Sequence, residues 1–599
     1  SVMGLATRFA RHRLHGLSTA RLATAQLATA GLLASLLLVA SPNPAQADVI
    51  SEVNDALLNI IQNTSISLID GPPEVAREIS MVDGAMFDAV NAASGSPYAP
   101  MAYTGGAVAN ASPIAAALEA AVTTMNSLYG SGSLYQQYAG QTGASYYGPK
   151  GADPNAAAAA AYAKDLVGPS TKQMADVASQ ISDIAADLSG LGKGSSITTG
   201  IALGAAAGDA MIASRANDGS KAANVQTLTP FVPANEGQPG VYVPPNGRPA
   251  MTPTWGTVAP VGISKTTLNA LEAAVPAPLP LTSAGYALQV LQTECEGSGT
   301  ALPAAIESVC AKHNFLPESS NEAAAALFWN DPGSTATPPG HWLAIADTVS
   351  GGQNLDLLQH AREDALVGEA LDDAGVATWA VKYKYNLWRP VTAIRDCKAW
   401  NANFTTCDPT WTSLISTPPH PDYIAGHPAF SGAAATVLAS FFGTDNIAFN
   451  STSDAYCNSG GPTTNQLGIV TGCTLNGILY SVSTPGIHGC NNAPTEYGGF
   501  AVTSPSYNNS PLICPITEDF SSFSQASSGI LGAEFSRVVG GIHTPLAVEN
   551  ALALGDAVGE ALVSEPPILP VLASGLLALG LLLRRRPPLS SPAKRERLG

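Results

Sequence analysis

Apolar residues recur at helical spacing along most of this chain. Between Glu74 and Ala93, the residues Val75, Ile79 and Val82 fall on one face of a helix with 3.6 residues per turn. The same pattern predicts helices over 107–125, 155–167, 172–190, 198–216, 265–274, 284–293, 321–330, 340–349, 354–376, 377–389, 428–442, 525–539 and 545–562. Alternating, strand-like stretches are few, so the predicted fold class is all-α.

Three stretches interrupt this helical pattern. Residues 126–154 are rich in Gly, Ser, Tyr and Gln, which predicts an irregular loop. Residues 217–262 are rich in proline, which neither a helix nor a central strand tolerates, so we expect a long ordered connection there. Residues 445–524 are rich in Asn, Ser, Gly and Pro and hold four cysteines, which predicts an excursion pinned by disulfides.

The eight cysteines all lie in the second half of the chain. Their number is even and no two form a C-x-x-C pair, which favours disulfides over zinc binding or redox chemistry. Disulfides in turn indicate an oxidising compartment. Pairing of neighbours is predicted because each pair would close a short loop: Cys295 with Cys310, Cys397 with Cys407, Cys457 with Cys473, and Cys490 with Cys514.

Residues 1–47 have the pattern of a secretory signal peptide. Arginines come first, an apolar run extends from Leu27 to Ala40, and Ala45-Gln46-Ala47 precedes Asp48 as a cleavage site. A transmembrane anchor is the alternative, but the apolar run is shorter than the roughly 20 residues that a span needs.

Residues 563–599 resemble a PEP-CTERM sorting tail of Gram-negative bacteria. Glu565 and Pro566 precede an apolar stretch that three arginines close. The resemblance implies transient membrane anchoring and export to the periplasm, the cell surface or the medium; a plain single-span tail is the alternative. Between the two ends we expect an N-terminal helical region over 48–290 and a C-terminal one over 291–562.

The chain is acidic, with 27 basic against 45 acidic residues and a net charge of -18. It offers no broad basic face for a phosphate backbone, so nucleic acid is not an expected partner. Against this background a cluster of basic residues within 382–398 suggests an anion site: Lys382, Lys384, Arg389, Arg395 and Lys398.

Lys382 and Arg389 are the most informative pair in this cluster. They lie seven residues apart, so both are predicted to project from one face of a helix that kinks or ends at Pro390. A guanidinium fork beside an ammonium group suits a phosphate-shaped oxyanion. The alternative is a solvated basic face that offsets the acidic surface.

A second candidate segment contains Gly426 and His427 at the predicted start of a helix. Amide groups at a helix N-terminus attract anions, and a glycine lets the backbone approach closely. His427 has a pKa suited to proton transfer, although a lone loop histidine can also be merely hydrogen-bonded.

A third segment contains Arg537 and His543, separated by two glycines. Thr544 as a helix N-cap and Pro545 as the first helical residue would hold both side chains toward one point. An ordinary connection between two helices is the alternative. Each of the three segments supplies groups that can bind an oxyanion, so chance explains their combination poorly.

Together these spacings resemble the vanadium-dependent haloperoxidases and the acid phosphatases of the type 2 phosphatidic acid phosphatase superfamily. The shared motifs are Lys382 with Arg389 and Pro390, then Gly426 with His427, then Ser536 with Arg537 and His543. The segments 81–91, 253–256, 328–331, 338–342 and 382–390 are also similar to secreted bacterial haloperoxidases. The resemblance spans about residues 50–562.

The resemblance implies an all-α fold of two four-helix bundles with vanadate in the C-terminal one. It implies that His543 is the vanadium ligand and that Lys382, Arg389, Arg537 and the Gly426 amide hold the equatorial oxygens. His427 is then the acid–base and Lys382 also polarises the bound peroxide. The implied substrates are hydrogen peroxide, a halide and a small organic acceptor.

Two residues depart from the family pattern. Ala425 replaces a serine whose hydroxyl would bond the oxyanion, and a lost hydrogen bond to a charged group weakens binding by roughly 1.5–3 kcal/mol. Ala547 replaces an aspartate that would orient His543, a loss that a nucleophilic phosphatase histidine would tolerate less well than a ligand histidine. The sequence therefore favours a haloperoxidase over an acid phosphatase or a decayed surface protein.

Two further histidines concern the halide pocket. His420 lies seven residues before His427, where bromoperoxidases of this family tend to carry His and chloroperoxidases Phe. The resemblance thus favours bromide or iodide over chloride. His341 and Trp342 could line the same pocket, but a pair packed in the core at the start of a helix is the preferred interpretation.

Overall fold

The computed structural model describes residues 44–65, 69–141, 168–227, 231–244, 250–315, 320–333, 335–396, 400, 406–453 and 516–564, with short strands between 462 and 488. The predicted helix over 155–167 lies outside these residues. So do nearly all of the predicted signal peptide and the sorting tail. Of the predicted disulfides, those that involve Cys397, Cys457, Cys473, Cys490 and Cys514 also rest on side chains outside them.

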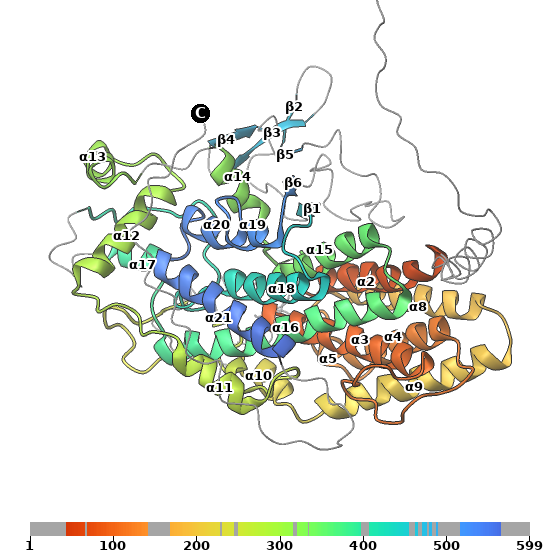
Figure 1. The fold of residues 1–599 in the computed structure, drawn as a ribbon. Coiled ribbons are helices and arrows are strands. Elements are labelled where there is room, and N and C mark those ends of the chain that lie inside the picture. The colour runs from red at the N-terminus through yellow and green to blue at the C-terminus, as the bar shows by residue number, and fades with distance from the viewer. Residues whose placement is uncertain are drawn as a thin grey trace, which may run out of the picture.

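The first half of the chain forms a group of packed helices. These are α2 (Pro44–Thr64), α3 (Pro72–Ala93), α4 (Pro113–Tyr129), α5 (Leu134–Tyr138), α8 (Thr171–Gly190) and α9 (Ser195–Arg215). Helix α3 packs on α4 and α9, and α2 packs on α8 (Figure 1). The helices predicted over 74–93, 107–125, 172–190 and 198–216 are confirmed, with shifted ends.

Helix α9 shows how small residues allow close packing in this group of helices. It is long and apolar enough to cross a membrane by length and composition, a test that a core helix of a soluble protein also passes. In the structure it packs along α4. A Cβ at Gly204 would collide with the backbone oxygen of Ala116, so only glycine allows the two helices to approach this closely.

The second half of the chain forms another helical group around α16 (Leu357–Tyr385), α18 (Gly426–Phe442) and α21 (Pro545–Ser564), which pack on one another. The remaining helices surround these three: α10 (Ser220–Thr227), the 3-10 turn η2 (Trp255–Thr257), α11 (Lys265–Ala274), α12 (Ala284–Glu296), α13 (Ala304–His313), α14 (Ser320–Phe328), α15 (Thr337–Gln353), α17 (Pro390–Arg395), α19 (Phe523–Ser528) and α20 (Ala533–Val539). The all-α fold class is confirmed.

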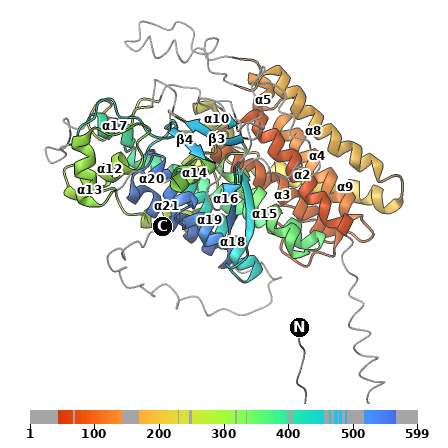
Figure 2. The same ribbon diagram turned by 90° about the horizontal axis from the view of Figure 1, so that it is seen from above.

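Helix α16 joins the two groups. It packs against α3 on one side and α18 on the other, and Figures 1 and 2 both show α8 and α9 on one side of the molecule and α12, α13 and α17 on the other. A capping box between Asp356 and Gln359 begins this 29-residue helix. Helices α15 and α16 contact both groups. The boundary at residue 290 between an N-terminal and a C-terminal helical region therefore stays a prediction.

All three stretches predicted to interrupt the helical pattern contain regular structure. The irregular loop predicted over 126–154 is wrong in part, because that stretch includes the last turn of α4 and helix α5. The connection over 217–262 includes α10 and η2. The excursion over 445–524 includes a sheet of β1 (Phe449–Ser453), β6 (Ile516–Phe520) and β5 (Ile487–His488), in that order, and a second sheet of β2 (Pro462–Thr464), β3 (Val470–Leu475) and β4 (Ile478–Ser481). Strands β1 and β6 are antiparallel, with Phe449 opposite Phe520. Local composition did not reveal these pairings because the partners are far apart in sequence.

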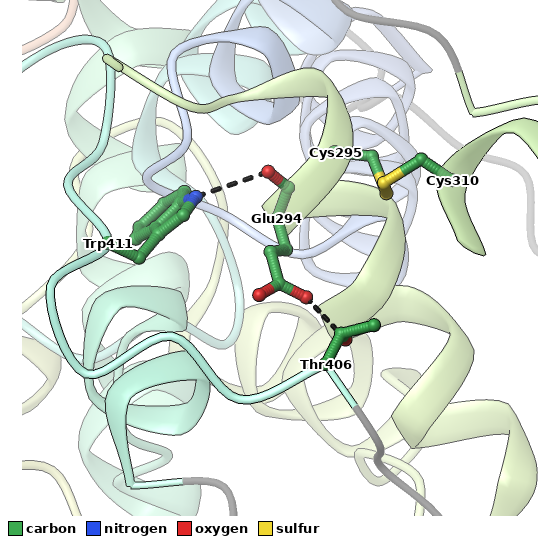
Figure 3. Close-up of a disulfide and its surroundings, with 5 residues drawn as sticks. All are labelled: Glu294, Cys295, Cys310, Thr406 and Trp411. Carbon is green, nitrogen blue, oxygen red and sulfur yellow. Dashed lines mark hydrogen bonds between the residues drawn. A yellow bond between two sulfur atoms is a disulfide. The ribbon is translucent and has the colours of Figure 1, made fainter. Parts of the chain in front are cut away.

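The predicted disulfide between Cys295 and Cys310 is confirmed, and it ties the end of α12 to α13 (Figure 3). Cys407 is disulfide-bonded as well. Beside the first disulfide, the buried carboxylate of Glu294 accepts a hydrogen bond of 2.7 Å from the Thr406 hydroxyl, and its backbone oxygen accepts one from Trp411 (Figure 3). The two hydrogen bonds fix α12 against the segment between α17 and α18.

Candidate active site

The three segments singled out in the sequence meet at one end of the C-terminal helical group. Lys382 lies in the last turn of α16, Arg389 is the N-cap of α17, and Gly426 is the first residue of α18. Arg537 lies on α20, and His543 lies between α20 and α21. Nη1 of Arg389 is 3.0 Å from Nε2 of His543, so the first and third segments are in direct contact.

The prediction that one helix carries both Lys382 and Arg389 is wrong. Helix α16 ends at Tyr385, and Asn386 adopts a left-handed conformation with φ of 47°. Asparagine tolerates this conformation better than most residues, so α16 can end before it. Pro390 is the first residue of α17, a position that proline favours, and does not mark the end of α16. The two cations reach the site from different elements.

Arg389 is the most heavily bonded cation of the site. Its buried guanidinium donates to the backbone oxygens of His420 (2.6 Å) and Ile542 (2.7 Å), in addition to the contact with His543. Lys382 is equally buried and donates to the backbone oxygen of Pro421 at 2.9 Å. These bonds fix both head groups beside the loop that precedes α18.

Asp422 is the functional residue that sequence reasoning missed. Its Oδ1 lies 2.7 Å from Nδ1 of His543, and its Oδ2 accepts a 2.8 Å hydrogen bond from the Thr544 hydroxyl. The inference that His543 lacks an orienting carboxylate because position 547 is alanine is therefore wrong. One signal was present: Asp422 is the only acidic residue between Thr417 and Phe430.

This contact determines the tautomer of His543. With its Nδ1 proton donated to Asp422, Nε2 carries the lone pair that a ligand atom needs. Burial, helped by the positive charges of Arg389 and Lys382, lowers the pKa of His543 well below its ordinary value. His543 is thus a neutral imidazole, the form in which histidine binds a metal centre.

His427 occupies the other side of the site. Its buried Nε2 has no hydrogen-bond partner among the described residues and lies 3.6 Å from Oδ2 of Asp331. Burial and the nearby charge of Arg537 lower the pKa of His427 well below its ordinary value. A neutral imidazole with an unpartnered nitrogen can accept a proton from a bound molecule.

His341 belongs to the layer behind His427. Its Nδ1 lies 3.1 Å from Oδ1 of Asp331, and its ring packs against Phe328 and Trp329. The preferred interpretation of a core-packed pair is confirmed, since both His341 and Trp342 are buried. The structure adds that His341 contacts the carboxylate that faces His427.

Arg537 extends the positive lining. Its Nη2 donates to the backbone oxygen of Ala326 at 3.1 Å and its Nε to the hydroxyl of Ser536 at 3.0 Å. Its Nη1 is buried without a hydrogen-bond partner among the described residues. A fully buried guanidinium with an unused donor suits an anionic ligand.

His420 lies beside Arg389. Its Nδ1 is 2.9 Å from Nη2 of Arg389, and its ring centre is 5.2 Å from that of Trp379 and 6.5 Å from that of His543. The structure therefore brings the residue predicted for the halide pocket next to the other site residues.

The electrostatics of the site favour an oxyanion of the vanadate or phosphate type. Burial lowers the pKa of Lys382, and it lowers the pKa of Arg389 to about 10 and that of Arg537 to about 9. Burial raises the pKa of Asp422 to about 6, and Asp422 and Asp331 are two carboxylates beside three cations. An oxyanion would supply the missing charge, and it would also meet the first amides of α18, which have no partner within the helix.

Comparisons with known proteins agree with this geometry. Residues 364–472 match a family model described as the VCPO second helical-bundle domain. A vanadium chloroperoxidase from Curvularia inaequalis is 27% identical over 150 residues, which are 22% of this chain and 24% of that protein. The crystal structure of a bacterial vanadium-dependent iodoperoxidase superposes with a TM-score of 0.55 at 19% identity, covering 86% of this chain and 96% of that one.

The matched segment holds Lys382, Arg389, Asp422 and His427, whereas Arg537 and His543 lie outside it. The structural match covers most of the chain and concerns the fold. The chain therefore has the helical fold of the vanadium haloperoxidases, and residues 364–472, which begin in α16, are similar to the second helical-bundle domain that the family model describes.

Proposed function

We propose that this protein is a vanadium-dependent haloperoxidase, which uses hydrogen peroxide to oxidise a halide to hypohalous acid. The observation that carries the proposal is the pair His543 and Asp422. It keeps the lone pair of His543 on Nε2, where Nη1 of Arg389 now lies at 3.0 Å and where bound vanadate would take the place of that donor. Neither a solvated basic face nor an ordinary helix connection requires this arrangement.

In this proposal the chain's own residues hold vanadate by charge and by hydrogen bonds. Nε2 of His543 binds vanadium, while Lys382, Arg389, Arg537 and the amide of Gly426 hold the oxygens. Bound vanadate supplies Lewis acidity that activates peroxide toward the halide. The pKa values of the cations, lowered by burial, would rise again beside the bound anion.

His427 is the proposed acid–base. Its unpartnered Nε2 would accept a proton from hydrogen peroxide and give it back when water is released, and Asp331 at 3.6 Å would stabilise the imidazolium in between. Lys382, held by Pro421, directs its ammonium group toward the reacting oxygens and polarises them. The products are hypohalous acid and water, and the hypohalous acid halogenates an organic acceptor.

We propose bromide or iodide as the preferred halide. The support comes from His420, whose ring adds a polar group next to Arg389 where a phenylalanine would present only carbon. Because Nη2 of Arg389 lies 2.9 Å from Nδ1 of His420, this side of the guanidinium is bonded to the imidazole and is less free to contact a bound ion.

A second candidate function is an acid phosphatase, and Asp422 favours it. A carboxylate that orients His543 would serve a nucleophile as well as a ligand. Nε2 of His543 would attack phosphorus, the ester oxygen would leave with a proton from His427, and water would then cleave the phosphorus–nitrogen bond. The absent carboxylate at position 547 no longer argues against this reaction.

One pair of assays separates these functions. Purified protein is tested for bromination of a dimedone-type acceptor with hydrogen peroxide, with and without orthovanadate, and for hydrolysis of p-nitrophenyl phosphate without vanadate. Bromination that requires vanadate supports the haloperoxidase. Ester hydrolysis that vanadate inhibits, without bromination, supports the phosphatase, and failure of both assays supports a decayed surface protein.

We further propose that the protein is exported and transiently anchored. The support is the pattern of residues 1–47 and 563–599, and the disulfide between Cys295 and Cys310 suits an oxidising compartment. Cell fractionation with antibodies against residues 48–562 and against each end of the chain tests this: the mature protein should react only with the first antibody and be absent from the cytoplasm.

A further inference from the structure

A second cluster of ionisable groups, most of them buried, lies where α2 and α3 of the first helical group meet α15 and α16 (Figure 1). Nε2 of His360 lies 3.1 Å from Oδ1 of Asp347 and 3.4 Å from Oδ2 of Asp364. These three atoms all lie within 4.8 Å of one another. Asp347 lies on α15, while His360 and Asp364 lie one turn apart on α16, so the packing of these two consecutive helices brings the three side chains together.

Two polar side chains from the other helices add to this cluster. Nδ2 of Asn54, on α2, donates to Oδ2 of Asp364 at 3.0 Å and to Oδ1 of Asp347 at 3.3 Å. Its Oδ1 is buried without a hydrogen-bond partner among the described residues. Asp83, on α3, is 1% exposed and both of its carboxylate oxygens lack such a partner. Buried polar atoms without a hydrogen-bond partner are costly unless a ligand binds them or, for a carboxylate, a proton neutralises the charge.

The charge of the cluster is not balanced by basic side chains. Other buried acids near α3, α9 and α16 do have basic partners: Arg77 pairs with Asp218, and Arg215 pairs with Asp372. No lysine or arginine of the described residues forms a salt bridge with Asp83, Asp347 or Asp364. Burial, together with the charge of Asp347, raises the pKa of Asp83 and of Asp364 well above the ordinary value, because unpaired carboxylates are costly in the interior.

We propose that Asp347, Asp364 and His360 bind a divalent cation, with Asn54 and Asp83 completing its surroundings. Ligand atoms about 2.1 Å from one ion, at angles between octahedral and tetrahedral, lie roughly 3.0–3.4 Å apart. The separations of 3.1 and 3.4 Å from His360 agree with this. If the amide of Asn54 turns over, its unpartnered Oδ1 takes the place of Nδ2 and faces the ion.

The ligand types select the class of cation. An imidazole among carboxylates suits Mn²⁺, Fe²⁺ or Zn²⁺ better than Ca²⁺ or Mg²⁺, which prefer oxygen ligands alone. The site is remote from the oxyanion chemistry and rests on no part of the proposed function. Bound there, the cation joins α15 to α16, the helix whose far end carries Lys382.

The first test uses the wild-type protein. Untagged full-length protein, free of vanadate, is purified without chelator, and its metal content is measured by mass spectrometry. After treatment with EDTA and dialysis, Mn²⁺ or Zn²⁺ alone is added and thermal unfolding is recorded. We expect about one equivalent of divalent metal and a rise in unfolding temperature of about 5 °C when it returns.

The second test assigns the ligands. Asp347→Asn and Asp364→Asn should each abolish both the bound equivalent and the metal-dependent rise in unfolding temperature. Asp373→Asn is the matched control, because this buried carboxylate of α16 accepts hydrogen bonds from the amides of Val261, Gly262 and Ile263. That variant should lose stability yet keep its metal.

Two results would overturn the proposal. If the wild-type protein holds no divalent metal and neither ion raises its unfolding temperature, the carboxylates share protons with His360 instead. If metal binds equally well to Asp347→Asn and Asp364→Asn, its site is elsewhere. Should these variants fail to fold, the wild-type measurements decide the question by themselves.

Discussion

Asp422 and His543 lie 121 residues apart in the chain, yet Oδ1 of the first is 2.7 Å from Nδ1 of the second. The carboxylate precedes α18 and the imidazole precedes α21, and the packing of these two helices brings them together. This contact supplies the orienting group that the local pattern around His543 lacks. It also leaves open two chemistries, ligation of vanadium and nucleophilic attack on phosphorus, that the oxyanion site could perform.

The first prediction concerns that contact. Asp422→Asn should weaken vanadate binding about 10- to 100-fold, because the amide can no longer accept the Nδ1 proton with a full charge. The measurement is vanadate affinity by titration, with bromination as a second readout. Asp396→Asn, at an exposed position after α17, is the control and should bind as tightly as the wild type. Equal affinity in both variants would remove Asp422 from the site.

The second prediction separates the two histidines. His543→Ala should lose vanadate binding, whereas His427→Ala should keep binding but lose turnover by about 100-fold or more, because only its proton transfer is removed. Binding and initial rates are measured on the same preparations, with exposed His313→Ala as the control. Wild-type activity in either variant would contradict the assigned roles.

The third prediction concerns stability and pH at Glu294. Burial raises the pKa of Glu294 to about 8 from 4.5, so the protonated acid stabilises the fold at low pH and this contribution is lost as pH rises through 8. Between these pKa values the wild-type protein should lose up to about 1.4 kcal/mol per pH unit relative to Glu294→Gln.

Urea unfolding of both proteins from pH 5 to pH 9 measures this difference. Glutamine resembles the protonated acid in shape and can still accept the hydrogen bond from Thr406 (Figure 3). The free energies of unfolding should agree near pH 5 and diverge as pH rises. Parallel curves over the whole range would show that Glu294 is ionised throughout.

The fourth prediction concerns the disulfide. Replacing Cys295 and Cys310 together by serine should lower the free energy of unfolding by about 3 kcal/mol, since the bond closes a loop with a sequence separation of 15. The midpoint of urea unfolding, followed by circular dichroism under oxidising conditions, measures the loss. Because Thr293 of the same helix donates to the backbone oxygen of His543, vanadate affinity is measured alongside. An unchanged midpoint would contradict the prediction.

The helices and the chemistry of the candidate site could be predicted from the sequence because both have local signals. Helical periodicity of the apolar residues located α3, α8, α11 and α18 to within a few residues. A cluster of basic residues within 382–398 of an acidic chain, together with Gly426 at a helix start, predicted an oxyanion site. The short spacing of Cys295 and Cys310 also predicted their bond correctly.

Only the tertiary structure decided how these parts meet. A single left-handed residue, Asn386, separates α16 from α17 and sends Lys382 and Arg389 to the site from different elements, which periodicity does not reveal. The pairing of β1 with β6, the contact between Asp422 and His543, and the hydrogen bond from Asn54 to Asp364 all join distant segments. Local sequence sets which face of each element is buried, but the packing of whole helices determines which distant side chains share that interior.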